Sequence, residues 1–363
     1  MNRIIIAGGG TGGHIFPAIA IANALKRLQP DIGILFVGAK GKMEMEKVPR
    51  AGYKIEGLEI AGFERGALLK NIALPLKLLK SLVQANRVFK QFRPDAVIGV
   101  GGYASFPMLY LAQWKGIPTI IQEQNSYAGK ANKILGRKAS KICVAYKGMG
   151  RFFPEEKIIL TGNPVREAIT GSTIKRQEAR SFFELNAPGK TVLAVGGSLG
   201  ARSINESLEL HLDEFIDNGV LLIWQTGKLY YEKAKAAAAN HETGIKVFEF
   251  IYKMEAAYSA ADVVISRAGA LAISELCVAK KPAVFVPYPY AAEDHQTRNA
   301  LSLVNKNAAL MVKDADARQE LVAKTLHLLA DEKMQEILIS NISGLGIADA
   351  DNRIATEVLK LLK

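Results

Sequence analysis

Cysteine is scarce in this chain of 363 residues, which contains only Cys143 and Cys277. Two cysteines without metal-ligand spacing exclude a disulfide framework and a cysteine metal site, so we expect both to be reduced core residues of a cytosolic protein. No apolar stretch approaches the roughly 20 residues needed to cross a bilayer. Since the first residues lead directly into a strand pattern, we also expect no secretory signal.

Acidic residues are scarce in the first half of the chain. Residues 1–164 contain 24 Lys and Arg against 10 Asp and Glu, whereas residues 165–363 contain 23 against 25. A basic surface of this kind attracts a polyanion or an anionic membrane. Because no zinc-finger spacing or aromatic RNA-binding strand accompanies it, we exclude nucleic acid as the partner.

Lysines alternate with leucines in residues 68–83, and Arg87, Lys90 and Arg93 continue the basic series. This pattern is typical of a surface that rests among lipid headgroups. It equally fits an ordinary amphipathic helix that packs its leucines into the core and exposes its lysines. The segment alone leaves both interpretations open.

Apolar runs alternate with helical patterns along the whole chain, which predicts two α/β domains with doubly wound parallel sheets. Turn residues near 161–166 predict a boundary, and the helical pattern of 351–363 suggests a terminal helix that folds back on the first domain. We therefore expect one domain of residues 1–163 plus 344–363 and another of 164–343. The predicted strands are 3–7, 32–37, 54–58, 96–100, 119–122 and 141–144, then 191–195, 220–225, 245–249, 263–266, 283–286 and 309–311.

Glycine-rich loops follow the first predicted strand of each half, at residues 7–14 and 195–202, and a third loop spans 99–105. Helices are predicted after the first two loops, over 15–28 and 203–215. A strand, a tight glycine loop and a helix direct backbone N–H groups toward one place, which suits a phosphate. Gly8, Gly10 and Gly13 also fit a dinucleotide fingerprint. A nicotinamide enzyme is nevertheless a minor alternative, because no acid ends the second strand to hold a ribose.

Two further features predict chemistry at these loops. His14 lies at the start of a helix, where the helix dipole disfavours a protonated imidazole, so it is our candidate general base. In the second half a helix begins near Ala270, and Glu275 lies one and a half turns into it, where a carboxylate can accept both hydroxyls of a ribose. The polar residues 122–125 end another strand, at an edge where sugars are bound.

Five motifs occur in a fixed order, at residues 9–14, 122–125, 162–166, 196–201 and 267–275. Together they resemble the motif set of the MurG family, GT-B-fold N-acetylglucosaminyltransferases that turn lipid I into lipid II in bacterial peptidoglycan synthesis. The resemblance runs from Met1 to the final helix. It implies two Rossmann-like domains that face a cleft, the first receiving the acceptor and the membrane, the second binding UDP-N-acetylglucosamine.

The resemblance also implies roles for individual residues. The donor would contact Thr11, Gly12, Gly13, Asn125, Arg166, Ser198, Ile251, Ala270, Leu271, Ala272, Ile273, Ser274, Glu275 and Gln296. Of these, Ser198 would hold a phosphate oxygen, Glu275 the ribose, Ile251 the uracil through its backbone, and Asn125 and Gln296 the N-acetylglucosamine. The pyrophosphate of the lipid acceptor would meet Gly10, Gly101, Gly102 and Tyr103, beside His14.

The implied reaction is an inverting transfer in which the muramyl C4 hydroxyl attacks C1 of the donor sugar as UDP leaves. No acidic metal-binding cluster is evident near the motifs, so we expect neither a metal nor a cofactor. The implied partners are UDP-N-acetylglucosamine, undecaprenyl-linked lipid I and an anionic membrane at the cytoplasmic face of the inner membrane, with room for contacts to other cell-wall synthesis proteins. The alternatives are a GT-B transferase with a soluble acceptor, a UDP-sugar 2-epimerase, and a nucleotide-sugar-binding protein without turnover.

Overall fold

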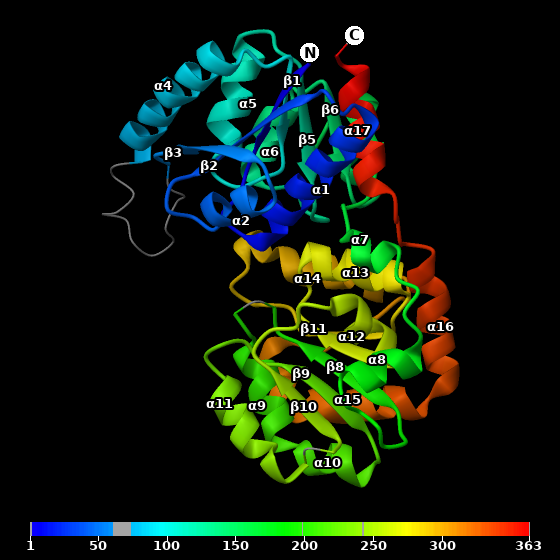
Figure 1. The fold of residues 1–363 in the computed structure, drawn as a ribbon. Helices are drawn as coiled ribbons and strands as arrows, with labels where there is room; N and C mark the ends of the chain where they lie inside the picture. Colours follow the sequence, from blue (N-terminus) through cyan, green and yellow to red (C-terminus); the bar gives the residue numbers. More distant parts are fainter. Residues whose placement is uncertain (1, 61–73, 198, 242, 363) are drawn as a thin grey trace. The chain divides into compact units, whose positions relative to one another are not determined.

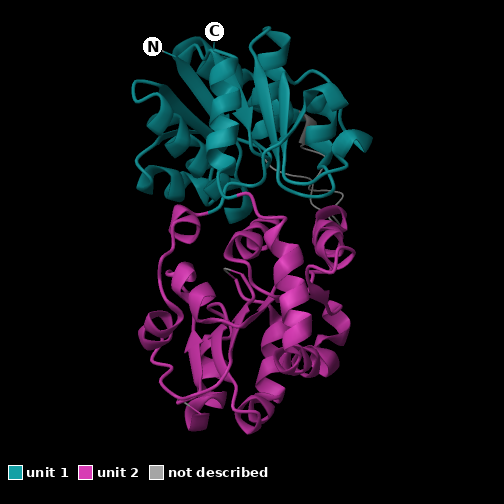
Figure 2. Ribbon diagram, turned by 90° about the vertical axis from the view of Figure 1, so that its right-hand side faces the viewer, with its two compact units in different colours: residues 1–165, 348–363 teal, residues 166–347 magenta. Residues whose placement is uncertain are grey.

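The computed structural model describes residues 2–60, 74–197, 199–241 and 243–362. The chain forms two compact units (Figures 1 and 2). Unit 1 comprises Met1–Val165 and Ala348–Lys363, and unit 2 comprises Arg166–Ile347. The expected boundaries, after residues 163 and 343, fall close to these divisions; the ligand roles given to the two halves remain predictions.

Unit 1 contains one parallel sheet in the order β3-β2-β1-β4-β5-β6-β7. Its strands are β1 (Arg3–Ala7), β2 (Gly33–Ala39), β3 (Lys54–Leu58), β4 (Ala96–Gly99), β5 (Thr119–Glu123), β6 (Lys141–Val144) and β7 (Ile158–Leu160). Its helices are α1 (Gly12–Leu28), α2 (Glu44–Arg50), α4 (Leu74–Phe92), α5 (Ser105–Trp114), α6 (Lys130–Gly136) and α17 (Ala350–Lys360).

Both faces of this sheet are buried, as expected for a doubly wound sheet. Successive side chains of a strand point to opposite faces, so Ile5 joins the core under α4 and α5 while Ile4 and Ile6 join the core under α1. The terminal helix α17 adds Ile354 and Val358 to that second core, and Arg27 on α1 donates to Asp351 at 2.6 Å. The expected return of the C-terminal helix to the first unit is therefore present.

Unit 2 contains a second parallel sheet, in the order β10-β9-β8-β11-β12-β13. Its strands are β8 (Thr191–Val195), β9 (Leu221–Gln225), β10 (Ile245–Phe248), β11 (Val263–Ser266), β12 (Ala283–Phe285) and β13 (Leu310–Met311). Its helices are α7 (Glu167–Thr170), α8 (Arg176–Phe182), α9 (Arg202–Leu210), α10 (Leu212–Asp217), α11 (Tyr231–Ala237), α12 (Met254–Ala260), α13 (Ala270–Ala279), α14 (His295–Val304), α15 (Ala317–Ala330) and α16 (Glu332–Ser343).

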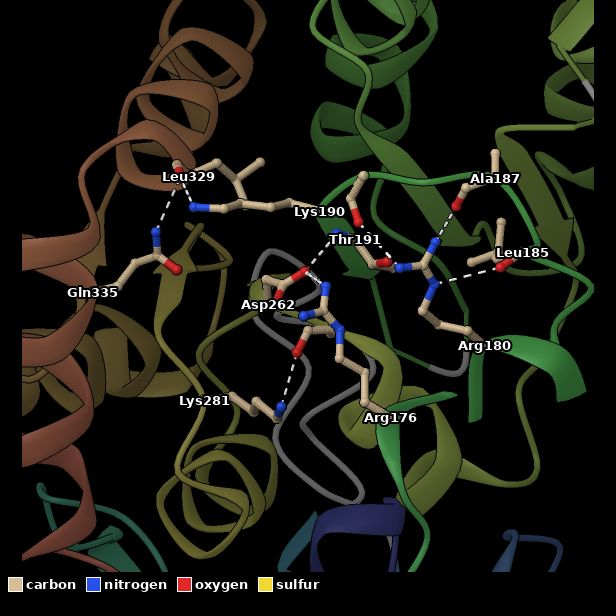
Figure 3. Close-up of polar contacts among 12 residues, drawn as sticks. Arg176, Arg180, Leu185, Ala187, Lys190, Thr191, Asp262, Lys281, Leu329 and Gln335 are labelled. Atoms are coloured by element: carbon tan, nitrogen blue, oxygen red, sulfur yellow. Dashed lines mark hydrogen bonds and ion pairs between the residues drawn. The ribbon is translucent and has the colours of Figure 1, made fainter. Parts of the chain in front are cut away.

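The amino edge of the second sheet is held by polar contacts (Figure 3). Asp262, just before β11, accepts from the backbone N–H of Thr191 at 2.7 Å and from Arg176 on α8 at 2.5 Å. Lys281, just before β12, donates to the carbonyl of Ala261. Lys190 donates to the carbonyl of Leu329 at the end of α15. These contacts hold α8 and α15 at the edge of the sheet opposite the glycine loops.

The structure corrects two details of the sequence analysis. Unit 1 has a seventh strand, β7, where six were predicted, because its three apolar residues lead directly into the turn residues that predict the domain boundary. The helix expected over 203–215 is broken at His211 into α9 and α10. Residues 68–73 of the lysine-leucine segment lie outside the described residues. No helix in the part of the chain that is described is long and apolar enough to cross a membrane.

Candidate active site

Each sheet has a position where the strand order reverses, between β1 and β4 in unit 1 and between β8 and β11 in unit 2. Parallel sheets bind ligands at the carboxyl end of such a position, because the two connecting helices leave in opposite directions there. The glycine loops predicted from the sequence lie at these places. The loops after β1 and β4 flank the first position, and those after β8 and β11 flank the second.

The two glycine loops of unit 1 contact each other. Gly9 donates its N–H to the carbonyl of Gly101 at 3.2 Å. Gly102 has φ +85°, and a Cβ placed on it would lie 2.3 Å from the carbonyl oxygen of Gly9. Only glycine fits there, since a side chain would separate the loops. The loops therefore bring residues 101–103 beside Gly10 and His14, and their contact with an acceptor stays a prediction.

His14 is the third residue of α1, and its ring is held from the loop that precedes the helix. Its Nδ1 lies 3.0 Å from the carbonyl oxygen of Gly9 and 3.2 Å from Oγ1 of Thr11. A carbonyl oxygen only accepts, so Nδ1 carries the hydrogen in the neutral ring and Nε2 is the basic nitrogen. Nε2 would lie 2.7 Å from a Cβ on Gly101, which directs it toward the second glycine loop.

Gly10 differs from its predicted role. Its N–H donates at 2.8 Å to Oε2 of Glu44, the first residue of α2, whose side chain is buried. The other oxygen of Glu44 accepts from the N–H of Ala39 at 2.9 Å. Because this carboxylate already occupies the Gly10 amide, that amide is not available to the pyrophosphate of an acceptor. Glu44 could not be singled out from the sequence, because it lies in a charged stretch typical of a solvated turn.

Asn125 follows β5 in unit 1, and a buried carboxylate fixes its position. Oε1 of Glu123 accepts from the backbone N–H of Asn125 at 3.1 Å and from its side-chain amide at 3.3 Å. Oε2 accepts from Gly129 at 3.1 Å and Asn132 at 2.8 Å. Burial raises the pKa of Glu123, while the four N–H donors oppose that rise. The carboxyl group thereby orders the loop that carries Asn125.

In unit 2 the loop after β8 contains Ser198, the predicted phosphate ligand, which lies outside the described residues. Its neighbour Gly197 accepts at its carbonyl from Gln225, at the end of β9, at 3.1 Å. Gln225 also accepts the N–H of Ile251 at 2.9 Å. Ile251 was predicted to contact uracil through its backbone. Since its N–H is already used, a base would be bound through its carbonyl oxygen.

The helix α13 begins at Ala270, as predicted, and Glu275 is 7% exposed within it. Arg166 holds this carboxylate with two parallel bonds, Nε to Oε1 at 2.7 Å and a terminal nitrogen to Oε2 at 2.8 Å. The buried hydroxyl of Tyr258 donates to the same Oε2 at 3.1 Å. The structure thus brings the predicted Arg166 and Glu275 together and adds Tyr258, which the sequence analysis missed because it lies in an ordinary helical pattern.

The charges in this cluster support one another. Burial, with the charge of Glu275, raises the pKa of Tyr258 well above its ordinary value, so its hydroxyl remains a donor. Burial by itself lowers the pKa of Arg166, but the hydrogen bonds and charge of Glu275 raise it above its ordinary value. The first turn of α13, which carries Ala270, Leu271 and Ala272, leaves backbone N–H groups without a partner inside the helix. An anion is stabilised at such a helix end.

Two other side chains fix the loops of unit 2 at the same edge of the sheet. Arg267, before α13, donates to the carbonyl oxygens of Val286 at 3.0 Å and Pro287 at 3.2 Å, and forms an ion pair with Asp314. Arg267 belongs to the motif at residues 267–275, but no role was predicted for it. Gln296 on α14 accepts from the backbone N–H of Tyr288 at 2.9 Å. Ser274 donates to the carbonyl of Ala270 within α13, and Ile273 is buried.

The predicted residues therefore fall into two groups, one at the carboxyl edge of each sheet. Among the described residues, no three or more His, Cys, Asp or Glu side chains gather in an arrangement that would hold a metal ion. Unit 1 contains Gly10, Thr11, Gly12, Gly13, His14, Gly101, Gly102, Tyr103 and Asn125. Unit 2 contains Arg166, Ile251, Ala270, Leu271, Ala272, Ile273, Ser274, Glu275 and Gln296.

Comparison with known proteins identifies the family. Residues 4–144 match the glycosyltransferase family 28 N-terminal domain, and residues 191–354 match the glycosyltransferase family 28 C-terminal domain. A Phocaeicola vulgatus protein is 55% identical over 361 residues, which cover 99% of this chain and 96% of that protein. It is named UDP-N-acetylglucosamine--N-acetylmuramyl-(pentapeptide) pyrophosphoryl-undecaprenol N-acetylglucosamine transferase.

Solved structures agree with this assignment. The crystal structure of Acinetobacter baumannii MurG is 31% identical and aligns with a TM-score of 0.80, over 99% of this chain and all of that chain. A UDP-N-acetylglucosamine 2-epimerase structure aligns with a TM-score of 0.64 at 15% identity, over 99% of this chain and 95% of that one, which shows the fold alone. The described chain, with its two parallel sheets and the motifs at their carboxyl edges, belongs to the MurG family of glycosyltransferase family 28.

Proposed function

We propose that this chain transfers N-acetylglucosamine from UDP-N-acetylglucosamine to the C4 hydroxyl of the muramyl sugar of lipid I, which forms lipid II for peptidoglycan synthesis. The observation that carries this proposal is the full-length identity to relatives named for that transfer, 55% over 361 residues. The edge residues described above supply the chemistry that the transfer needs.

Unit 2 is the proposed donor-binding unit. The first turn of α13 presents N–H groups to the diphosphate, and its dipole stabilises the negative charge that develops on UDP as the bond to C1 breaks. Arg166 lies next to Glu275 at the same edge and adds a positive charge. Glu275 is the proposed ligand of the ribose, and the carbonyl of Ile251 is the proposed ligand of uracil.

Unit 1 is the proposed acceptor-binding unit. The acceptor hydroxyl loses its proton to Nε2 of His14 as its oxygen attacks C1, and UDP leaves with the electron pair of the broken bond. The attack from the opposite side of C1 inverts that centre. Gly101, Gly102 and Tyr103 are the proposed contacts of the acceptor pyrophosphate, since the amide of Gly10 is held by Glu44.

Release of UDP tests this function directly. The purified chain, incubated with UDP-N-acetylglucosamine, should release UDP only when a lipid I analogue is added, and mass spectrometry should find one added N-acetylglucosamine on the analogue. A transferase with a soluble acceptor would release UDP with that acceptor instead. A 2-epimerase would change the donor without any acceptor, and a binding protein without turnover would release no UDP with lipid I.

The exposed side of α4 supports a further part of the proposal, peripheral binding to an anionic membrane at the cytoplasmic face of the inner membrane. Leu76, Leu79 and Val83 are 72%, 61% and 66% exposed, and they recur along one side of the helix. Lys77 and Lys80 are exposed beside them. Apolar side chains flanked by lysines suit the headgroup region of a bilayer, where a lipid-linked acceptor is reached.

Charge reversal on α4 tests this surface. We expect Lys77→Glu with Lys80→Glu to weaken binding to phosphatidylglycerol-containing vesicles by about tenfold or more, since each basic residue near an anionic surface contributes about 1 kcal/mol. Binding should also weaken as salt rises. The matched control is Lys228→Glu with Lys235→Glu, two exposed lysines of unit 2. Equal binding of the two variants in a flotation assay contradicts the proposed surface.

A further inference from the structure

One peptide group in the first glycine loop has a charged partner at one end and His14 at the other. The peptide that joins Gly9 to Gly10 donates its N–H to Oε2 of Glu44 at 2.8 Å. The carbonyl of the same peptide accepts from Nδ1 of His14 at 3.0 Å. A carboxylate, a peptide group and an imidazole therefore form one continuous chain of hydrogen bonds.

The position of Glu44 in this chain is fixed by burial and by a second bond. Glu44 is only 1% exposed, and its Oε1 accepts from the N–H of Ala39 at the end of β2. Gly9 has φ +142°, and a Cβ placed on it would lie 2.3 Å from the carboxyl carbon of Glu44. Only a residue without a side chain lets the carboxylate come this close to the loop. The first glycine loop therefore needs glycine at position 9 to accommodate the Glu44 carboxylate.

The charge of Glu44 changes the hydrogen bond at the far end of the peptide. An N–H that donates to a carboxylate forms a bond roughly twice as strong as one between neutral groups. Such a bond polarises the peptide, and linked hydrogen bonds strengthen one another by about 10–30% each. The carbonyl of Gly9 then becomes a better acceptor for Nδ1–H. This stabilises the tautomer with a basic Nε2, and it stabilises the imidazolium that forms when Nε2 takes a proton.

We propose that Glu44, the Gly9–Gly10 peptide and His14 form a relay in which Glu44 acts through the peptide to hold His14 as a base at Nε2. Glu44 is a positioning residue and does not contact the substrate. During transfer the acceptor hydroxyl gives its proton to Nε2, the oxygen forms its bond to C1, and the phosphate oxygen of UDP leaves with the electrons of the bond that breaks. Glu44 keeps its charge throughout. The inference rests on the proposed role of His14 as base.

The tautomer of His14 is the first test, and it needs no substrate. Nitrogen-15 NMR of the histidine-labelled chain distinguishes a protonated from an unprotonated ring nitrogen, and comparison with His14→Gln assigns the signal among the five histidines. In the neutral wild-type ring we expect hydrogen on Nδ1 and none on Nε2. The opposite tautomer overturns the relay, whatever the activity of the chain.

The second test removes the charge of Glu44. In Glu44→Gln we expect a mixture of tautomers at His14 and a fall in kcat of about tenfold to a hundredfold, part of the about 10²–10⁴-fold that a positioned general base contributes. The affinity for UDP should not change, because the proposed contacts of uracil, ribose and the diphosphate lie in unit 2. A folded Glu44→Gln variant with the tautomer and kcat of the wild type overturns the relay.

A matched control separates the relay from a general effect of charge. Glu46 lies on the same short helix, is exposed and pairs with Arg50 at 2.9 Å. Glu46→Gln removes the same charge and should leave both the tautomer and kcat unchanged; an equal loss in this control overturns the relay. If Glu44→Gln unfolds below the assay temperature, the NMR measurement of the His14 tautomer in the wild-type chain still tests the relay. If His14→Ala retains full activity while transfer to lipid I continues, the relay is overturned because His14 is not the base, whereas the proposed transferase function is unaffected.

Discussion

His14→Ala should lower kcat by about a hundredfold to ten-thousandfold, the range that a positioned general base contributes. The acceptor hydroxyl is a poor nucleophile until its proton is removed, and the ring of His14 is held at Nδ1 by Gly9 and Thr11 so that Nε2 is basic. Alanine leaves no group to take that proton. The measurement is initial UDP release at saturating donor and lipid I analogue.

Binding of UDP and a second histidine provide the controls for this variant. The affinity for UDP, measured by calorimetry, should be that of the wild type, because the proposed nucleotide contacts belong to unit 2. His241→Ala changes a histidine of unit 2 whose partner is Asp213, 3.3 Å away, and should not affect turnover. Addition of imidazole should restore part of the rate of His14→Ala. Near wild-type turnover without imidazole would remove His14 from the mechanism.

The sheets were predictable because a strand that is buried on both faces has a continuous run of apolar residues in the sequence. All twelve predicted runs correspond to strands within a residue or two at their ends. The strand β7 was missed because Ile158–Leu160 form only a short apolar run beside the boundary turn, and the run becomes a strand by pairing with β6. The break between α9 and α10 was missed because His211 gives no local stop signal such as proline or glycine.

The candidate site was predictable where its residues form local motifs, and not where a contact joins distant segments. His14 and Glu275 stand at fixed places after a strand and a glycine loop, so spacing alone indicated them. Glu44 reaches Gly10 across 34 residues, and Arg166 reaches Glu275 across 109. Such pairs arise from the folding of the sheet, and a single sequence contains no pattern that joins them. For the same reason the use of the Gly10 amide by Glu44 was not foreseen.

Glu275→Ala should lower the free energy of unfolding of unit 2 by about 3 kcal/mol, the lower end of the cost of breaking a buried ion pair. The cost stays at the lower end because the Arg166 side chain is 38% exposed and is hydrated when its partner is lost. The variant removes two bonds from Arg166 and leaves the buried hydroxyl of Tyr258 without its acceptor. Tyr258→Phe should cost only about 1 kcal/mol, because it deletes donor and bond together. Urea unfolding of both variants, with the exposed Glu336→Ala on α16 as the control, measures these differences.

Ligand binding separates this structural effect of Glu275 from its proposed role at the ribose. Oε2 already accepts two bonds, so a ribose that uses both carboxylate oxygens must displace at least one of them, and Arg166 is the more exposed partner. We expect Glu275→Ala to weaken UDP by about a hundredfold, since a hydrogen bond to a charged group contributes about 1.5–3 kcal/mol. The same substitution should hardly affect 2′,3′-dideoxy-UDP, which lacks both hydroxyls. If the two nucleotides lose affinity equally, the carboxylate acts only by ordering Arg166 and the ribose is held elsewhere.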